Sequence, residues 1–366
     1  MKLYLIAGEA SGDLHGSNLV KALLARDPST ECRAWGGDKM QAAGASIVKH
    51  YRDLAFMGFV EVVKNLRTIL GNLAFCKQDI LDYQPDALVL IDYPGFNLRI
   101  AKWAHKQGIR VIYYISPQIW AWHRARVYDI KRDVDKMLVI LPFEPDFYKK
   151  YGVNATFVGH PLLDAIELEA ETDLLGPKTG NTIALLPGSR KQEVTRILPV
   201  MLSITPFYPE YQFVIAGASA LNAEFYAPML AAYPNVSLQF DQTYAMLRAA
   251  KAALVKSGTS TLETALIGTP QVVCYTGSPV SYAIARRLVD VKYISLVNLI
   301  MDQPLVQELI QDQFNTQQVK AALDQILTPE VATDMRVAYA ALRVVLGGGG
   351  ASWRAAGEVL ELFEQK

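Results

Sequence analysis

The sequence lacks several features that would assign it to a specialised class. Its 366 residues contain only three cysteines, which lie far apart and form no CxxC pair, so neither a disulfide framework nor a cysteine metal site is indicated. Lys+Arg and Asp+Glu are equal at 36 each, which removes the basic excess typical of nucleic-acid-binding proteins. No uncharged run approaches the roughly 20 residues of a membrane-spanning helix. Residues 1–8 indicate a strand and a turn rather than a signal peptide. We therefore expect a protein of the reducing cytoplasm with free thiols, whose only membrane contact is peripheral.

What is present is an alternation of short apolar runs and segments of helical period in both halves of the chain. Continuous apolar runs are typical of parallel strands that are buried on both faces. Repeated βα units predict α/β architecture, with a doubly wound sheet in each half. The predicted strands are 3–7, 87–91, 111–115, 137–141, 182–186, 213–216, 236–240, 252–255 and 271–275, and the predicted helices include 17–25, 60–83 and 98–107.

The length of the chain predicts two domains. An acidic run followed by glycines and a proline near residues 159–180 resembles a linker. We therefore expect an N-terminal lobe at 1–165 and a C-terminal lobe at 166–346. Four consecutive glycines at 347–350 interrupt two helical patterns, and their backbone freedom favours a sharp bend. The last segment, 347–366, is expected to form a helix that packs on the first lobe or on a partner subunit.

Two glycine-bearing turns in the second half carry the clearest chemical signal. The sequence LLPGSR at 185–190 and the sequence KSGTSTLE at 256–263 each follow a strand-like run and precede a helix-like one. Such turns place backbone N–H groups at a helix N-terminus, where a phosphate group is stabilised. Two of them in one domain suggest a diphosphate-containing ligand, although each alone is equally compatible with ordinary strand-to-helix connection and helix capping. In the first half, Gly8, Gly12 and Gly16 do not form GxGxxG, which argues against a nicotinamide dehydrogenase.

Seven short strings are more specific than this general pattern. They are GEASGDLHG at 8–16, MGFVEV at 57–62, IDYPGFN at 91–97, YISPQIWAW at 114–122, FVGHPL at 157–162, LPGSR at 186–190 and SGTSTLE at 257–263. In this order they resemble the lipid-A-disaccharide synthase family, and weaker matches continue through 295–300 and 308–312. The resemblance implies the GT-B fold, two Rossmann-like lobes with the active site in the cleft between them.

The resemblance also implies a reaction. The family transfers 2,3-diacylglucosamine from its UDP derivative to the 6-hydroxyl of 2,3-diacylglucosamine 1-phosphate (lipid X). The products are a β(1→6) disaccharide 1-phosphate and UDP, and the anomeric centre inverts. Neither a cofactor nor a bound metal is expected, so protein groups must stabilise the charge of the leaving group. Partners would be these two lipids and the cytoplasmic face of the bacterial inner membrane, without nucleic acid, and a homodimer is conceivable.

An inverting transfer needs a base for the acceptor hydroxyl and positive charge near the departing diphosphate. Asp92 is the candidate base because it ends a buried strand and precedes a loop, although it could instead cap the helix expected near Phe96. Arg190 is the candidate diphosphate ligand. Around it, Gly188 would permit close approach of the ligand and Ser189 would donate a hydrogen bond. His15 is a second acid–base candidate, although a histidine at a helix start is more often structural.

The remaining candidates are expected to bind substrate. Ser257, Gly258, Thr259, Ser260 and Thr261 would supply amides and hydroxyls to the diphosphate. Glu263 has two readings: the spacing from Ser260 to Glu263 fits a capping box, whereas glutamates at this place in GT-B folds commonly hold the ribose. Polar contacts to the sugars are expected from the group that comprises Glu9, Ser11, Gly12, Asp13 and Asn298.

Both substrates carry acyl chains, and residues 54–73 are richer in apolar residues than a one-faced surface helix requires. One stripe would face the core and the rest would meet lipid, with basic groups near anionic headgroups. The expected membrane residues are Phe59, Val62, Val63, Leu66, Ile69 and Leu70. A helix buried on two sides is the alternative. The nearest rival functions are a UDP-N-acetylglucosamine 2-epimerase on the same fold and a nucleotide-sugar binding protein without catalysis.

Overall fold

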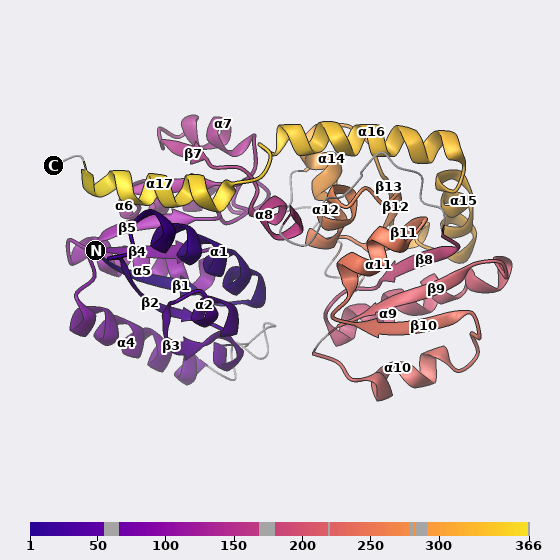
Figure 1. Cartoon of the computed structure of the whole chain (residues 1–366), viewed down its shortest axis with the longest axis horizontal. Coiled ribbons are helices and arrows are strands. Elements are labelled where there is room, and N and C mark those ends of the chain that lie inside the picture. Colours follow the sequence, from indigo (N-terminus) through magenta and orange to yellow (C-terminus); the bar gives the residue numbers. More distant parts are fainter. Residues whose placement is uncertain (55–65, 168–179, 219, 279–281, 283–290, 365–366) are drawn as a thin grey trace. The chain divides into compact units, whose positions relative to one another are not determined.

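The structure is a computed structural model that describes residues 1–54, 66–167, 180–218, 220–278, 282 and 291–364. The chain forms two compact units. Unit 1 comprises Met1–Asp164 together with Leu346–Lys366, and unit 2 comprises Ala165–Val345. The C-terminal segment therefore belongs to the same compact unit as the N-terminus (Figure 1).

Unit 1 is built on a seven-stranded parallel sheet with the strand order β3-β2-β1-β4-β5-β6-β7. Side chains alternate along β1, so that Leu3, Leu5 and Ala7 pack into one core and Tyr4 and Ile6 into another. Helices therefore cover both faces of the sheet. The strands are β1 (Lys2–Ala7), β2 (Glu31–Gly36), β3 (Ser46–His50), β4 (Ala87–Ile91), β5 (Arg110–Tyr114), β6 (Lys136–Val139) and β7 (Ala155–Phe157).

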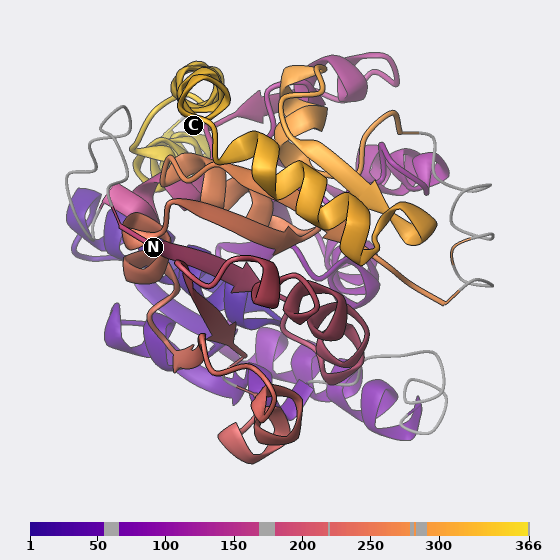
Figure 2. The ribbon, with the colours of Figure 1, turned by 90° about the vertical axis from the view of Figure 1, so that its right-hand side faces the viewer.

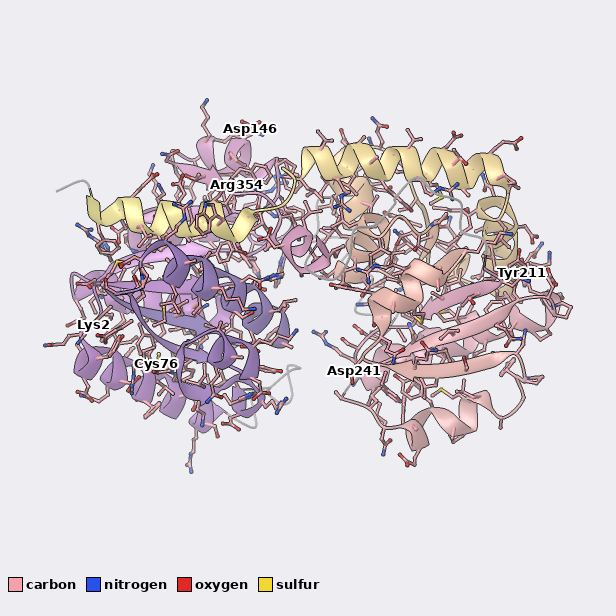
Figure 3. All side chains as sticks on the ribbon, in the orientation of Figure 1. Lys2, Cys76, Asp146, Tyr211, Asp241 and Arg354 are labelled. Atoms are coloured by element: carbon pink, nitrogen blue, oxygen red, sulfur yellow. The ribbon has the colours of Figure 1, made fainter. Side chains whose placement is uncertain are left out.

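The helices of unit 1 divide between those two cores. The first core receives α1 (Ala10–Arg26) and α17 (Ala351–Glu364), and the second receives α4 (Leu66–Tyr83), α5 (Pro94–Lys106) and α6 (Val127–Asp133). Cys76 on α4 points into the second core (Figure 3). All three cysteines are buried and unpaired, as expected. The shorter elements are α2 (Asp38–Ala42), α7 (Glu144–Lys149) and the 3-10 turns η1 (Tyr51–Leu54) and η2 (Arg124–Arg126). Helix α8 (Pro161–Glu167) spans the boundary between the units, after Asp164.

One helix of unit 1 begins earlier than its sequence indicated. We expected the first helix at 17–25, but α1 begins at Ala10, with Glu9 at its N-cap. The string at 8–16 is therefore mostly helix rather than a loop that could wrap a ligand. Gly12 lies inside α1, where an added Cβ would come 3.1 Å from the Cβ of Ala7. This glycine allows α1 to pack closely on the end of β1.

Unit 2 contains a six-stranded parallel sheet with the order β10-β9-β8-β11-β12-β13. Its strands are β8 (Thr182–Leu186), β9 (Gln212–Gly217), β10 (Val236–Phe240), β11 (Ala252–Lys256), β12 (Gln271–Tyr275) and β13 (Gln307–Ile310). Helix α16 contacts α12, α14 and α15 (Figure 2). The helices are α9 (Lys191–Leu202), α10 (Ala223–Leu230), α11 (Thr243–Ala249), α12 (Thr259–Leu266), α14 (Leu296–Met301), α15 (Thr316–Ile326) and α16 (Pro329–Val345), with 3-10 turns η3 (Thr205–Phe207) and η4 (Gln311–Gln313).

The glycine-rich segment 347–350 is fixed from both sides in unit 1. The Asp164 carboxylate accepts hydrogen bonds from the N–H groups of Gly350 at 2.6 Å and Ser352 at 2.8 Å, and thereby caps α17. Arg354, labelled in Figure 3, donates to the carbonyl oxygens of Val158 at 2.8 Å and Gly349 at 2.9 Å. Helix α17 then packs along α1. The bend is therefore a defined turn that returns the chain to unit 1.

Candidate active-site residues in the two units

Unit 2 contains a cavity of about 460 Å³ at the carboxyl ends of β8, β9 and β11. Ligands of open α/β sheets bind at this edge. Both glycine-bearing turns contribute to the wall, as their sequences predict for a shared site. The lining residues are Leu186, Gly188, Ser189, Arg190, Glu193, Ala216, Gly217, Ala218, Thr243, Tyr244, Lys256, Gly258, Thr259, Ser260 and Glu263.

The first turn connects β8 to α9, and Arg190 occupies the N-cap of that helix. Gly188 has φ of +111°, and an added Cβ would lie 2.6 Å from a Glu193 carboxylate oxygen. Only glycine fits this backbone beside that side chain. The same Glu193 oxygen accepts hydrogen bonds from the N–H groups of Ser189 at 3.3 Å and Arg190 at 3.4 Å. The space in front of Gly188 is thus filled by an internal carboxylate, which the sequence interpretation did not foresee.

The second turn connects β11 to α12, and Gly258 is the N-cap residue. Thr259 and Ser260 line the cavity. Two other hydroxyls of this turn serve the backbone, since Ser257 donates to the Ile294 carbonyl at 3.0 Å and Thr261 donates to the Gly258 carbonyl at 2.8 Å. Thr261 is completely buried. The turn therefore offers the cavity only part of the hydroxyl set that its sequence suggested.

Glu263 is not part of a capping box, because α12 begins at Thr259 and Ser260 lies inside the helix. Its carboxylate lines the cavity and accepts a hydrogen bond from the Tyr244 hydroxyl at 2.9 Å. Burial raises the pKa of Glu263, and the hydrogen bonds from Tyr244 and Ser260 oppose that rise. A carboxylate held by a tyrosine at the cavity wall is suited to accept hydrogen bonds from sugar hydroxyls.

Asn298 lies elsewhere in unit 2. Its side chain is buried, donates to the Val306 carbonyl at 2.8 Å and to the Glu308 carboxylate at 2.9 Å, and accepts from the Val306 N–H at 3.0 Å. These bonds join α14 to the segment that leads into β13. Asn298 lines a different cavity from the glycine turns, so the structure does not bring it together with them.

In unit 1, Asp92 follows the last residue of β4 and is half-buried. Both Asp92 and Tyr93 have left-handed backbones, with φ of 46° and 49°. The Asp92 carbonyl accepts hydrogen bonds from the Asn97 amide at 2.8 Å and the Tyr113 hydroxyl at 2.7 Å. Helix α5 begins at Pro94, with Tyr93 as an N-cap that makes no side-chain cap bond. The Asp92 carboxylate is therefore not the cap, and its strained backbone is held by two buried side chains.

Glu9 is the charged group that acts on Asp92. Burial and then the Glu9 carboxylate raise the pKa of Asp92 to about 6. Asp92 follows β4 and Glu9 follows β1, which are neighbouring strands, so both lie at the same sheet edge. The Tyr93 ring occupies the position that a side chain at residue 8 would need, so Gly8 cannot be replaced there by a larger residue. A carboxyl with a raised pKa at this edge has the properties of a general base that works near neutral pH.

The other first-lobe candidates have mostly structural surroundings. Asp13 is only 3 % exposed, and its carboxylate accepts from the N–H groups of Gly37 at 2.7 Å and Met40 at 3.1 Å, which caps α2. His15 is buried in α1, and burial lowers its pKa to about 4 although Asp164 opposes the shift. Asp164 and Lys39 are the charged groups that act on His15, whereas Glu9 acts on Asp92, so the two candidates do not share a charged neighbour. Ser11 is exposed on the first turn of α1.

Three of the expected membrane residues, Phe59, Val62 and Val63, lie outside the described residues, and so does the side chain of Leu66. Of the remaining two, Ile69 packs against the second core of unit 1, whereas Leu70 is 56 % exposed. Phe75 and Leu81 on the same helix are also exposed. The described part of α4 is therefore not buried on two sides. Among the described helices, none combines the length and the hydropathy needed to cross a bilayer.

Several residues of the cavity were missed from the sequence. Glu193 and Lys256 form an ion pair at 2.9 Å inside it, and Tyr244 holds Glu263. Lys256 is the first residue of the second turn's string, directly after the predicted strand 252–255, and that position was the available signal. No group of three or more His, Cys, Asp or Glu side chains is placed to hold a metal ion in the part of the chain that the structure describes.

Solved glycosyltransferases and UDP-GlcNAc 2-epimerases share the fold of this chain, which has two parallel α/β sheets. UDP-GlcNAc 2-epimerase from Neisseria meningitidis, solved with UDP-GlcNAc bound, superposes with a TM-score of 0.68 at 15 % identity, covering 99 % of this chain and 100 % of that one. The calicheamicin glycosyltransferase CalG4 gives 0.63 at 16 % identity, covering 100 % and 98 %. At these identities the likeness defines the fold alone, which is the GT-B architecture that the sequence predicted.

The sequence comparisons specify the family. A family model described as lipid-A-disaccharide synthetase matches residues 3–341. The lipid-A-disaccharide synthase of Trichlorobacter lovleyi is 41 % identical over 375 residues, covering 100 % of this chain and 98 % of that protein. The chain belongs to the lipid-A-disaccharide synthase family, and it is a glycosyltransferase of lipid A biosynthesis. The resemblance seen in the short sequence strings is confirmed.

Proposed function

We propose that the protein transfers 2,3-diacylglucosamine from UDP-2,3-diacylglucosamine to the 6-hydroxyl of lipid X, with inversion at the anomeric carbon. The family membership supports the reaction class. The observation that carries the donor assignment is the unit 2 cavity, whose wall contains two glycine turns at helix N-termini together with Arg190 and Lys256. Cations and helix N-termini stabilise the charge that develops on a leaving diphosphate.

In this proposal unit 2 binds the UDP portion of the donor. The Arg190 guanidinium and the amides of Ser189, Thr259 and Ser260 bind the diphosphate, and Glu263 accepts hydrogen bonds from the ribose. The position of these groups around a single cavity supports the assignment. The hydroxyls of Ser257 and Thr261 and the side chain of Asn298 keep the structural hydrogen bonds that they already make.

Unit 1 supplies the base in this proposal. Asp92 accepts the proton of the acceptor hydroxyl as that oxygen attacks the anomeric carbon, and burial together with the Glu9 charge keeps the pKa of Asp92 high enough for the task. Ser11, exposed at the start of α1, is the further polar contact for the acceptor. The buried His15 and the capping carboxylate of Asp13 take no part in proton transfer.

The acyl chains require a site of contact with lipid. We propose that α4 lies peripherally on the cytoplasmic face of the inner membrane. Leu70, Phe75 and Leu81 are exposed on α4, while Leu73 and Ile80 anchor the same helix in the core. An amphipathic helix of this kind buries its outer apolar side chains at the boundary of headgroups and acyl chains.

The proposed reaction is tested by incubating the purified protein with UDP-2,3-diacylglucosamine, with and without lipid X, while UDP and the disaccharide are measured. We expect release of UDP that depends on lipid X, with one disaccharide formed for each UDP. UDP release that is unchanged by lipid X would contradict transfer to this acceptor. Interconversion of the donor sugar without an acceptor would instead indicate an isomerase.

A further inference from the structure

Lys256 lies where the two glycine turns of unit 2 come together. It is the last residue of β11, and its ammonium is 2.9 Å from the carboxylate of Glu193 on α9. The same ammonium lies 3.7 Å from the point where a Cβ on Gly258 would stand. The side chain of Lys256 lines the cavity and is 24 % exposed. A lysine in this position reaches both helix N-termini at once.

Glu193 occupies the place where an anion would bind at α9. One of its oxygens accepts from the N–H groups of Ser189 and Arg190, and the other pairs with Lys256. The two N–H bonds are 3.3 and 3.4 Å long, whereas charge-assisted bonds are typically about 2.7–2.9 Å. The carboxylate is the N3 member of a capping box with Arg190 at the N-cap of α9, and its long bonds to the amides allow exchange for a better-fitting anion.

The balance of charge in the cavity leads to the same conclusion. Arg190 and Lys256 contribute two positive charges near the helix N-termini, and Glu193 cancels one of them. Glu263, the other carboxyl of the lining, is held by the Tyr244 hydroxyl. The diphosphate of a UDP-sugar carries two negative charges, so it matches the two cations only when Glu193 no longer neutralises Lys256. Once Glu193 has moved away, Arg190 and Lys256 can both form charge-assisted hydrogen bonds to the diphosphate.

We propose that Lys256 is a second cationic ligand of the donor diphosphate, and that Glu193 is its internal counter-ion, which leaves Lys256 and the α9 amides when the diphosphate binds. This inference rests on the proposed donor site in unit 2. Lys256 binds the diphosphate together with Arg190. Glu193 lowers the affinity for the diphosphate because it competes with it for Lys256 and for the α9 amides. Before the donor binds, the ion pair keeps the cations and amides satisfied.

Calorimetric titration of the full-length protein with UDP and with uridine tests the proposal. Lys256→Met is expected to weaken UDP binding about ten- to a hundredfold, the effect of losing one charge-assisted hydrogen bond, and to leave uridine binding unchanged. Glu193→Gln is expected to strengthen UDP binding a few-fold, because the competing charge is gone. The matched control is Lys251→Met, a lysine at the opposite end of β11 that donates to the Tyr211 hydroxyl.

The outcomes separate this inference from the donor site itself. If Arg190→Ala weakens UDP binding while Lys256→Met behaves like Lys251→Met, the role of Lys256 is refuted and the donor site stands. If both Arg190→Ala and Lys256→Met leave UDP binding unchanged in folded protein, the donor site is refuted as well. Weaker UDP binding by Glu193→Gln would refute the proposed competition, because it would show that the Glu193 carboxylate holds the first glycine turn in the conformation that binds UDP. Thermal unfolding of each variant verifies that it is folded.

Discussion

The rate of transfer should depend on pH through Asp92, and burial together with the Glu9 charge should set the pH at which the rate declines. Burial and the Glu9 charge raise the pKa of Asp92 from 3.8 to about 6. A general base works only when it is deprotonated. The wild-type rate at saturating substrate should therefore be constant above about pH 7 and should fall tenfold per pH unit well below pH 6.

The substitution Glu9→Gln removes the charge that raises the pKa of Asp92 and leaves the effect of burial in place. Because burial is the larger contribution, the pKa of Asp92 should fall by only about half to one pH unit. At pH 5 the variant should then retain a fraction of its own plateau rate about three- to fivefold larger than wild type retains. At pH 8 both proteins should be at their plateau.

The assay is kcat from pH 4.5 to 8.5, measured as disaccharide formed under saturating donor and acceptor. The phosphate of lipid X also titrates in this range, but it affects all proteins equally, so the comparison between variants isolates the enzyme group. Glu31→Gln is the control, because it removes the same charge at the opposite edge of the sheet, where β2 begins. Identical pH profiles for wild type and Glu9→Gln would refute the assigned cause of the shift, and a profile without any decline down to pH 4.5 would refute Asp92 as the base.

Two further predictions concern the support of the site and the membrane. Asn97 is fully buried and donates to the carbonyl oxygens of Ile6, Ile91 and Asp92. The substitution Asn97→Ala should therefore lower the free energy of unfolding by about 1–3 kcal/mol in a denaturant titration, and it should change kcat more than the KM of the donor. An unchanged kcat would contradict the role of Asn97 in positioning Asp92. Leu70→Asp should release the folded protein from anionic vesicles in a sedimentation assay, whereas Leu73→Asp, at a buried position, should unfold it. Vesicle binding equal to wild type by folded Leu70→Asp would contradict the proposed membrane face.

The sequence predicted most strands of both sheets, including the edge strand β10, and missed β2, β3, β7 and β13. The runs 87–91, 182–186 and 271–275 coincide with β4, β8 and β12, because these strands are buried on both faces and contain almost only apolar residues. The missed strands β3, β7 and β13 are all edge strands, and β2 is next to an edge. These missed strands are short or carry polar and charged side chains that hide the apolar pattern, whereas the alternating VSLQF of the edge strand β10 was predicted at its observed bounds.

The sequence predicted the part of the candidate site that is formed by the backbone of the two glycine turns. Both glycine turns line one cavity because parallel strands end at the same edge of a sheet. What the sequence does not reveal is where a side chain turns for its hydrogen bonds. Asp13 stands in a glycine-containing string, yet its carboxylate points to the N–H groups of a helix some 25 positions later, at Gly37 and Met40. Likewise, Glu193 reaches back to Gly188 and across to Lys256, and neither contact follows from spacing alone.

The most direct test of the proposed mechanism is the substitution Asp92→Asn, with UDP binding and transfer measured on the same preparation. Asparagine tolerates the left-handed backbone at this position, so the protein should fold and the unit 2 cavity should be unaffected. We expect the dissociation constant of UDP to stay within about twofold of wild type and kcat to fall at least about a hundredfold. A variant that binds UDP normally and still transfers sugar at a rate near that of wild type would contradict the assignment of Asp92 as the base.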